Sequence, residues 1–245
     1  RVWYVTGRGT VACLDTEGFH DGKNNGPYTA EPNENKDEAD VIWSFDMMKE
    51  LGVSQHNMCS CSVTCAGDVL FVNTSNGVSF EHLGIPAPKA ASFVAMDRNT
   101  GKVLWTDRLA SNTHEKHTLN SYASGTPASD GKRVFVLFTT NDDTVVRAYD
   151  FAGKSLWQTD VGRFYNQHGH GCGTSPIVWK DTVIVASQHD GPSVIAGLDA
   201  ATGKVRWRSE RKVRLTAHST PVILEREGKT PQLFTSNTGD GLASF

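Results

Sequence analysis

The sequence lacks the features that would mark a membrane span, a disulfide-rich domain or a nucleic-acid-binding protein. No apolar stretch in its 245 residues approaches the roughly 20 that a membrane helix requires. The five cysteines show no paired spacing typical of a disulfide framework, and we expect Cys13 and Cys65 to be small buried core residues. The net charge is only −3 and the basic residues are scattered, so the composition does not indicate a nucleic-acid-binding surface.

Glycine, by contrast, is abundant. The 23 glycines fall between short apolar runs, a distribution typical of many short strands joined by tight turns. The length allows one large β domain or two ordinary ones. Residues 1–5 already have the pattern of a strand rather than of a signal peptide, so we expect any export signal to lie upstream.

A repeat runs through the chain. Residues 95–105 and 197–207 share the pattern Asp-x-x-Thr-Gly-Lys-x-x-Trp, and residues 148–157 carry a copy whose turn is one residue shorter. The aspartate can accept hydrogen bonds from turn N–H groups, the glycine tolerates a positive φ, and the tryptophan is large enough to fill the space between neighbouring sheets. The predicted structural anchors of the repeat are Asp97, Gly101, Trp105, Asp150, Gly153, Trp157, Asp199, Gly203, Trp207 and Trp43.

Two further copies are incomplete. One begins at residues 12–18 and is separated from Trp43 by a polar insertion over 18–40, and the other starts at 242–244. Prolines at 127, 176 and 221 precede the copies and predict strand starts, because proline cannot donate to a β-ladder. Each unit then has four strands, A to D, with the aspartate ending strand C and the tryptophan on strand D, as in a propeller blade. We expect a partial blade over 1–49, blades over 50–109, 110–161 and 162–211, and a partial blade over 212–245.

The repeat resembles the pyrroloquinoline-quinone-type (PQQ-like) propeller repeat, whose signature is Ala-x-Asp-x-x-Thr-Gly-x-x-x-Trp. The resemblance implies an all-β fold, a β-propeller of four-stranded antiparallel blades like the PQQ and WD40 propellers. The chain is similar both to BamB-like outer-membrane assembly scaffolds and to bacterial quinoprotein-like repeat proteins, which implies a periplasmic or exported location. Propellers of this type have seven or eight blades, so we expect this chain to form an incomplete arc.

The resemblance does not by itself decide between a scaffold and an enzyme. Quinoprotein dehydrogenases hold PQQ between a tryptophan and a disulfide of two adjacent cysteines, beside a calcium ion. No adjacent cysteine pair occurs here, and Cys59 and Cys61 are separated by one residue. The resemblance leaves PQQ, calcium or a transition metal as candidate cofactors without establishing any of them, and no catalytic residue is assigned.

The histidines gather on one predicted face. The D-to-A and B-to-C connections of a propeller lie on the same side, and eight of the nine histidines map to them, His20 being the exception. The candidate metal ligands on this face are His56, His114, His117, His168, His170, Cys172, His189 and His218. No spacing among them matches a known zinc signature. A metal site, polar contacts to another ligand, and ordinary loop structure remain open as explanations.

Two functions follow as competing hypotheses. The first is a non-catalytic scaffold whose loops bind a protein, peptide or glycan partner. The second is a quinone- or metal-dependent oxidoreductase with its site on the histidine-rich face. A sensor domain fused to a segment outside this chain is a weaker third hypothesis.

Residues 45–51 are expected to form a short helix packed on the blades.

Overall fold

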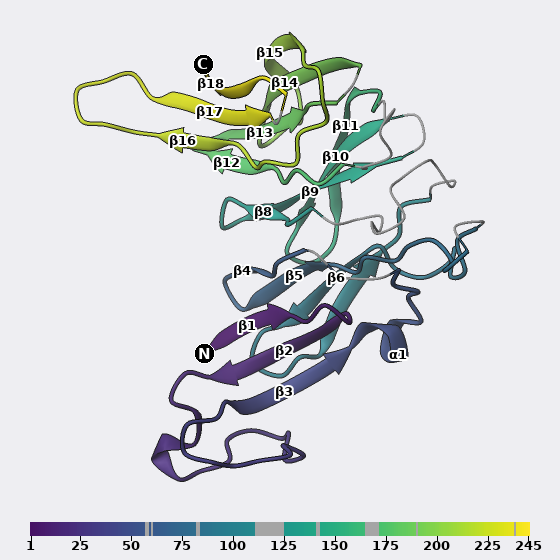
Figure 1. Ribbon diagram of the computed structural model, residues 1–245, viewed down its shortest axis with the longest axis vertical. Helices are drawn as coiled ribbons and strands as arrows, with labels where there is room; N and C mark the ends of the chain where they lie inside the picture. Colours follow the sequence, from purple (N-terminus) through teal and green to yellow (C-terminus); the bar gives the residue numbers. More distant parts are fainter. Residues whose placement is uncertain are drawn as a thin grey trace.

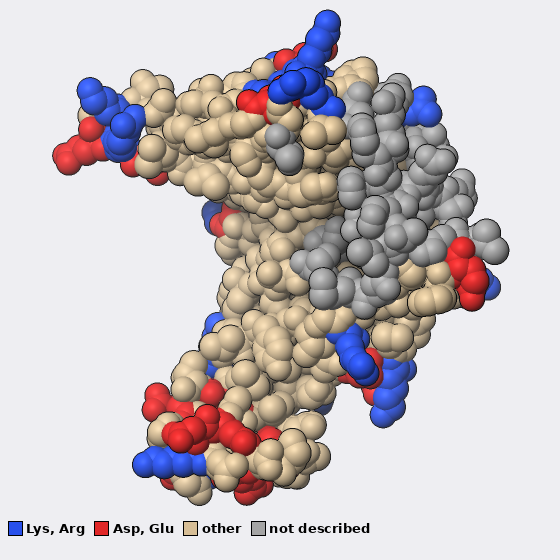
Figure 2. All heavy atoms as spheres, in the orientation of Figure 1, with Lys and Arg blue, Asp and Glu red and all other residues tan. Residues whose placement is uncertain are grey.

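The structure is a computed structural model, and it describes residues 1–56, Cys59, 61–81, 84–110, 125–140, 143–164, 172–189, 191–237 and 239–245. It is all-β. Five antiparallel sheets follow one another along the long axis of the molecule, from the N-terminal sheet at the bottom of Figure 1 to the C-terminal sheet at the top. In the same orientation, Figure 2 shows an arc that is hollowed on one side between its two ends.

Each sheet is built from strands in the order of the sequence. The first contains β1 (Val2–Val5), β2 (Thr10–Asp15) and β3 (Asp40–Asp46). The second contains β4 (Thr64–Ala66), β5 (Val69–Asn73), β6 (Phe93–Asp97) and β7 (Val103–Asp107). The third contains β8 (Ala128–Ser129), β9 (Arg133–Thr139), β10 (Thr144–Asp150) and β11 (Ser155–Gly162). The fourth contains β12 (Ile177–Trp179), β13 (Thr182–Ser187), β14 (Pro192–Asp199) and β15 (Val205–Lys212). The fifth contains β16 (Val222–Leu224), β17 (Gln232–Asn237) and β18 (Gly241–Ser244). The prediction of four-stranded antiparallel blades is confirmed.

The strand starts agree with the proline pattern, since β8, β12 and β16 each begin one residue after Pro127, Pro176 and Pro221. Strands β11 and β15 run one residue past the predicted ends of their blades, to Gly162 and Lys212. The exact division of the chain into blades therefore stays a prediction. Among the described residues, no helix is long and apolar enough to cross a membrane.

The core consists of one apolar cluster between each pair of neighbouring sheets. Strand β5 shows how the sequence builds it: Leu70 points into the cluster shared with the first sheet, and Phe71 points into the cluster shared with the third. Successive side chains of strand β13 point alternately into the cluster shared with the third sheet and into the cluster shared with the fifth. Because both faces of these central strands are buried, their sequences are continuous apolar runs rather than alternating ones.

The repeated aspartate closes the turn between strands C and D. Asp97 Oδ1 accepts hydrogen bonds from the backbone N–H groups of Asn99 and Thr100 and from the Thr100 hydroxyl, at 2.8 to 3.0 Å. These donors, the Thr100 hydroxyl first, lower the pKa of Asp97. In the fourth sheet, the Arg206 guanidinium and then the Thr202 hydroxyl lower the pKa of Asp199 to about 2. Because the folded-state pKa is depressed, this stabilisation is present at neutral pH and is lost only as the pH falls towards 2.

In three of the repeats, the tryptophan contacts the turn of the following sheet. Trp105 Nε1 donates to the Phe151 carbonyl at 2.9 Å, and a Cβ added to Gly153 would lie 2.7 Å from the Trp105 ring. In the same arrangement, Trp43 Nε1 donates to the Arg98 carbonyl and Trp157 Nε1 to the Ala200 carbonyl, both at 3.1 Å. A Cβ added to Gly101 would lie 2.7 Å from the Trp43 ring, and one added to Gly203 would lie 2.5 Å from the Trp157 ring. In every case the accepting carbonyl belongs to the residue after the repeated aspartate. An indole and a turn glycine therefore connect three successive pairs of sheets.

Trp207, on the outer strand of the fourth sheet, is placed differently. Its ring lies against Gly197, its cross-strand neighbour, and it is 38% exposed. The corresponding cross-strand neighbours of Trp105 and Trp157 are the alanines Ala95 and Ala148. A glycine in that position gives the Trp207 ring room to fold onto its own sheet.

Two local predictions need correction. Cys13 is buried as expected, but Cys65 is exposed, because it lies on β4, a three-residue strand at the edge of its sheet. The predicted helix begins two residues later than expected, as α1 (Met47–Leu51). Phe45 and Asp46 instead pair with β2, and the Asp46 carboxylate caps α1 by accepting the N–H groups of Met48 and Lys49.

The polar insertion joins β2 to β3. It contains the short 3-10 helix η1 (Gly18–Asp21), in which Phe19 is buried, and most of its remaining side chains are exposed or half-buried. Asp40, at the start of β3, is buried and accepts the Asn25 N–H at 2.8 Å. Figure 2 shows acidic side chains gathered at this end of the arc.

The contact between indole and glycine predicts that two glycine-to-alanine substitutions lower the free energy of unfolding by different amounts. Gly131→Ala introduces a side chain at φ +82° with nothing within 4 Å, and should lower the free energy of unfolding by about 1 kcal/mol through backbone strain alone. Gly153→Ala has a similar φ of +89° but also meets the Trp105 ring, and should cost about 2–4 kcal/mol. Denaturant-induced unfolding measures both. Equal losses would show that the indole contact contributes little.

Candidate functional site

The connections between strands define two faces of the arc. The turns from A to B and from C to D lie at one end of the strands, at the left in Figure 1, and the other connections lie at the opposite end, near α1. We call the second end the loop face. Its D-to-A segments are 47–63, 108–127, 163–176 and 213–221, and its B-to-C segments are 6–9, 74–92, 140–143, 188–191 and 238–240.

Three of the candidate histidines can be placed on the loop face. His56 is 3% exposed, and its ring centroid lies 6.2 Å from that of Phe80. His189 is fully buried between β13 and β14, whereas His218 is exposed in the connection that leads to β16. His20 lies in η1 of the insertion, on the opposite side. The candidates His114, His117, His168 and His170, and also His82, lie outside the described residues.

His189 has a local structural role that the sequence did not reveal. Its Nδ1 accepts the Gly191 N–H at 3.1 Å, so that nitrogen carries no proton in this arrangement. Its backbone N–H donates to the Ser193 hydroxyl at 2.9 Å, and the same hydroxyl donates to its carbonyl. The ring packs edge-on against Phe164 at 5.0 Å. These contacts stabilise the β13–β14 connection.

His218 and Cys172 come from neighbouring connections. A Cβ on Gly173, the residue after Cys172, would lie 2.9 Å from His218 Nδ1, so the two segments are in close contact. Cys172 itself packs against the core between the third and fourth sheets. Within the described ranges, no group of three or more histidine, cysteine, aspartate or glutamate side chains is arranged to hold a metal ion. The metal-site hypothesis therefore stays a prediction.

A row of hydroxyl side chains connects the inner strands of successive sheets on this face. The Ser62 N–H donates to Thr126 Oγ1 and the Thr126 N–H donates to Ser175 Oγ, both at 2.9 Å. The Thr174 hydroxyl donates in turn to the Ser219 carbonyl at 3.1 Å. Sequence reasoning singled out Pro127 and Pro176 and missed the role of Thr126 and Ser175 directly before them, although the Thr-Pro and Ser-Pro pairs were the available signal.

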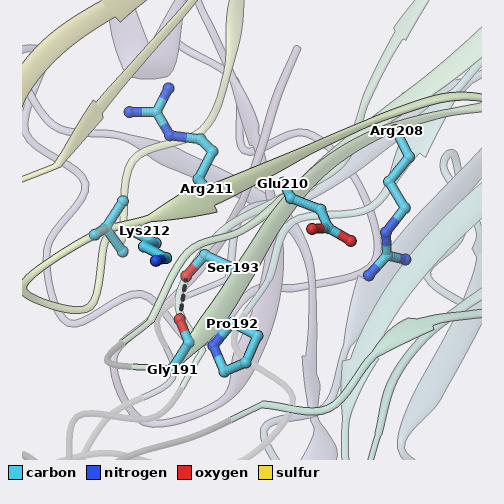
Figure 3. Close-up of a pocket in the computed structure, with 8 residues that line it drawn as sticks. Gly191, Pro192, Ser193, Arg208, Glu210, Arg211 and Lys212 are labelled. Carbon is cyan, nitrogen blue, oxygen red and sulfur yellow. Dashed lines mark hydrogen bonds between the residues drawn. The ribbon is translucent and has the colours of Figure 1, made fainter.

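A cavity of about 530 Å³ lies at the loop-face end of the β14–β15 hairpin (Figure 3). It is lined by Gly191, Pro192, Ser193, Arg208, Glu210, Arg211, Lys212 and Val213. Its two arginines reach away from each other in Figure 3. Arg208 donates to the Val161 carbonyl at 3.1 Å, and the Arg211 guanidinium lies 4.8 Å from the centre of the Phe245 ring. The cationic groups thus do not converge on a single ligand position.

Comparison with known proteins places this architecture in a family. The family model described as "Outer membrane protein assembly factor BamB" matches residues 89–239, more than half of the chain. The chain belongs to this BamB family. The matched region runs from the loop before β6 to the β17–β18 turn, and so includes the turns of the second, third and fourth sheets.

A curated BamB, the outer membrane protein assembly factor of Francisella tularensis subsp. tularensis (strain SCHU S4), is 28% identical over 114 residues. The alignment covers 46% of this chain and 20% of that protein. The chain thus matches about a fifth of the length of this curated relative.

Two solved structures share the fold over nearly the whole chain. A europium-containing methanol dehydrogenase superposes with a TM-score of 0.57 at 15% identity, covering 94% of this chain and 45% of the dehydrogenase. The quinohemoprotein alcohol dehydrogenase of Comamonas testosteroni superposes with a TM-score of 0.58 at 15% identity, covering 96% of this chain and 38% of that protein. At this identity the likeness shows the fold alone, and it confirms that the arc corresponds to part of a PQQ-type propeller.

The contacts of His189 predict that its replacement affects stability independently of metal. His189→Ala removes a fully buried ring and leaves the Gly191 N–H without its acceptor, so the free energy of unfolding should fall by about 2–4 kcal/mol. The exposed His20→Ala is the matched control and should change it by less than about 0.5 kcal/mol. Thermal and denaturant unfolding are measured with and without a chelator. A loss that disappears when chelator is present would instead indicate that His189 binds a metal.

Proposed function

We propose that this chain is part of a periplasmic, non-catalytic scaffold that acts in outer-membrane protein assembly and binds a protein partner through its loop face. Membership of the BamB family over residues 89–239 is the observation that carries the proposal. An outer-membrane assembly factor acts through contact with other proteins rather than through turnover of a small molecule. A periplasmic, outer-membrane-associated location follows from the same role.

The distribution of side chains supports the loop face as the binding surface. On the opposite face, the turn residues of the repeat are occupied by contacts that hold neighbouring sheets together. On the loop face, the connections of α1 and of β5–β6 carry exposed apolar side chains. Phe80 is 82% exposed, and Met48 of α1 is 44% exposed. Exposed aromatic side chains are typical anchors of protein interfaces.

Phe80 is the side chain best suited to insert into a partner. It lies in the β5–β6 connection, close to the buried ring of His56. Asn76, in the same connection, fixes the backbone by accepting the Ser54 N–H at 2.8 Å and donating to the Ala87 carbonyl at 2.9 Å. A rigid base under an exposed aromatic residue lowers the entropic cost of binding.

A photo-crosslinking amino acid at position 80 tests this surface. In the periplasm of cells that express the full-length protein, we expect position 80 to crosslink to a protein of the outer-membrane assembly machinery. Position 104 is the matched control, because Leu104 is also apolar and 50% exposed but lies on the outer strand β7. Equal crosslinking from both positions, or none from position 80, would contradict the assignment of the loop face.

The variant Phe80→Glu provides an independent measure. It should weaken the interaction with the crosslinked partner about tenfold or more, the usual effect of removing an interface anchor. Its thermal unfolding should match that of the unaltered protein, because the replaced ring is exposed. A variant that binds the partner with unchanged affinity would exclude Phe80 from the interface.

A further inference from the structure

Two cysteines on the loop face lie side by side in the connection between β3 and β4. Cys59 Sγ and Cys61 Sγ are 3.6 Å apart, and both residues are 6% exposed. They belong to the core cluster between the first and second sheets. Both are free thiols, as are Cys13, Cys65 and Cys172.

Polar contacts hold both sulfur atoms in place. Cys59 Sγ lies 3.1 Å from the Ser75 hydroxyl, and the Cys61 thiol donates to the Asn73 carbonyl at 3.0 Å. The Cys59 N–H donates to the Gly7 carbonyl of the first sheet at 2.9 Å. The pair is thus fixed from two sides, by the end of β5 and by the β1–β2 turn.

The two sulfurs are electrostatically different. The hydrogen-bonding contact with the Cys61 side chain, and then that with the Ser75 hydroxyl, lower the pKa of Cys59 to about 7, although burial acts in the opposite direction. The interaction with Cys59, together with burial, raises the pKa of Cys61. Cys59 is therefore the thiol that ionises at neutral pH, and the thiolate is the reactive form of cysteine. Cys61 is the resolving thiol, with its Sγ 3.6 Å from Cys59 Sγ.

We propose that Cys59 and Cys61 form a redox-active dithiol that closes to a disulfide by exchange with external disulfide compounds. The Cys59 thiolate attacks one sulfur of the external disulfide, forms a mixed disulfide with it and releases the other half as a thiolate. Cys61 loses its proton to solvent, and its thiolate then attacks Cys59 Sγ. The Cys59–Cys61 bond forms as the second half of the external compound leaves. The protein is oxidised by two electrons, and the external disulfide is reduced to two thiols.

Oxidation would alter a junction between sheets. The Cys61 S–H bond to the Asn73 carbonyl is lost when the disulfide forms, because the sulfur then carries no proton. Asn73 is fully buried, and its side-chain amide donates to the Gly125 carbonyl at the entry to the third sheet. The redox state of the pair therefore acts on a residue that joins the second sheet to the third.

The exposed Cys65 makes a sharp test available. Trypsin releases residues 50–89 as one peptide, which contains Cys59, Cys61 and Cys65 and no other cysteine. In full-length Cys65→Ser protein, the pair is left alone in this peptide. After equilibration with glutathione and glutathione disulfide, acid quenching and alkylation, we expect the peptide to lose about 2 Da and to contain a Cys59–Cys61 disulfide.

Single variants identify the order of attack. In Cys65→Ser protein, the added change Cys61→Ser should accumulate glutathione on Cys59, a gain of about 305 Da, because the peptide then holds no second thiol to resolve the mixed disulfide. In the same Cys65→Ser background, Cys59→Ser should react several-fold more slowly at neutral pH. In Cys65→Ser protein, alkylation of Cys59 by iodoacetamide should be half-maximal near pH 7, and Ser75→Ala should shift that midpoint upward.

The unaltered protein supplies the control for the reagent, because its exposed Cys65 should take up glutathione. If Cys65 reacts while Cys59 and Cys61 remain two free thiols at every glutathione ratio, the proposal is overturned. Separate glutathione adducts on both sulfurs, without closure, would overturn it equally. The measurement on Cys65→Ser protein stays decisive even if a variant at Cys59 or Cys61 does not fold.

Discussion

Three indole rings, those of Trp43, Trp105 and Trp157, each lie against a turn glycine of the following sheet and donate a hydrogen bond to a carbonyl of the same turn. This contact sets how closely and at what angle successive sheets approach. The apolar clusters between sheets require that spacing, because side chains from both sheets must interdigitate without voids. The turn can receive the ring only because the aspartate fixes its backbone and the glycine has no Cβ. A strand, a turn and a ring thus form one interaction that is repeated along the chain.

The same constraint divides the molecule into two chemically different ends. At the turn end, the C-to-D turns of the second, third and fourth sheets are fixed by their contacts with the preceding sheet, and their sequence repeats. At the loop face, the connections differ in length and composition from one sheet to the next, and they carry the exposed Phe80, the cysteine pair and the described histidines other than His20. Function in such architectures is expected where the scaffold leaves the chain free to vary. The proposed binding of a protein partner rests on membership of the BamB family and on these exposed apolar side chains.

The repeat made most of the fold predictable, because the Asp and Gly positions act within a few residues and the Trp positions reach only the turn of the next repeat. The starts of the strands after Pro127, Pro176 and Pro221 were predictable for the same reason, because the signal lies in the neighbouring residue. What could not be predicted depends on position in three dimensions. Cys65 has the sequence context of a core residue but lies on an edge strand. The helix start moved to Met47 because pairing with β2 outweighed helical periodicity at Phe45.

The candidate site was less predictable than the fold for the same reason. A histidine pattern in the sequence indicates a face but gives neither distances nor tautomers, and His189 stabilises a turn in a way that no spacing reveals. The proximity of Cys59 and Cys61 was visible as a Cys-x-Cys sequence. Their environment was not, since Ser75 and Asn73 come from the end of another strand.

The contact between an indole and a turn glycine also has a direction, because each of the first three sheets offers its ring to the next sheet, and each of the second to fourth sheets offers its glycine to the previous one. A duplicated sheet would therefore present the matching half of the contact to both of its neighbours. The number of sheets in such a chain can grow or shrink by whole units, with no new type of junction needed at the point of insertion. Gene duplication in steps of one repeat is thus compatible with the packing at every stage, whereas the loop face of each new copy is free to diverge.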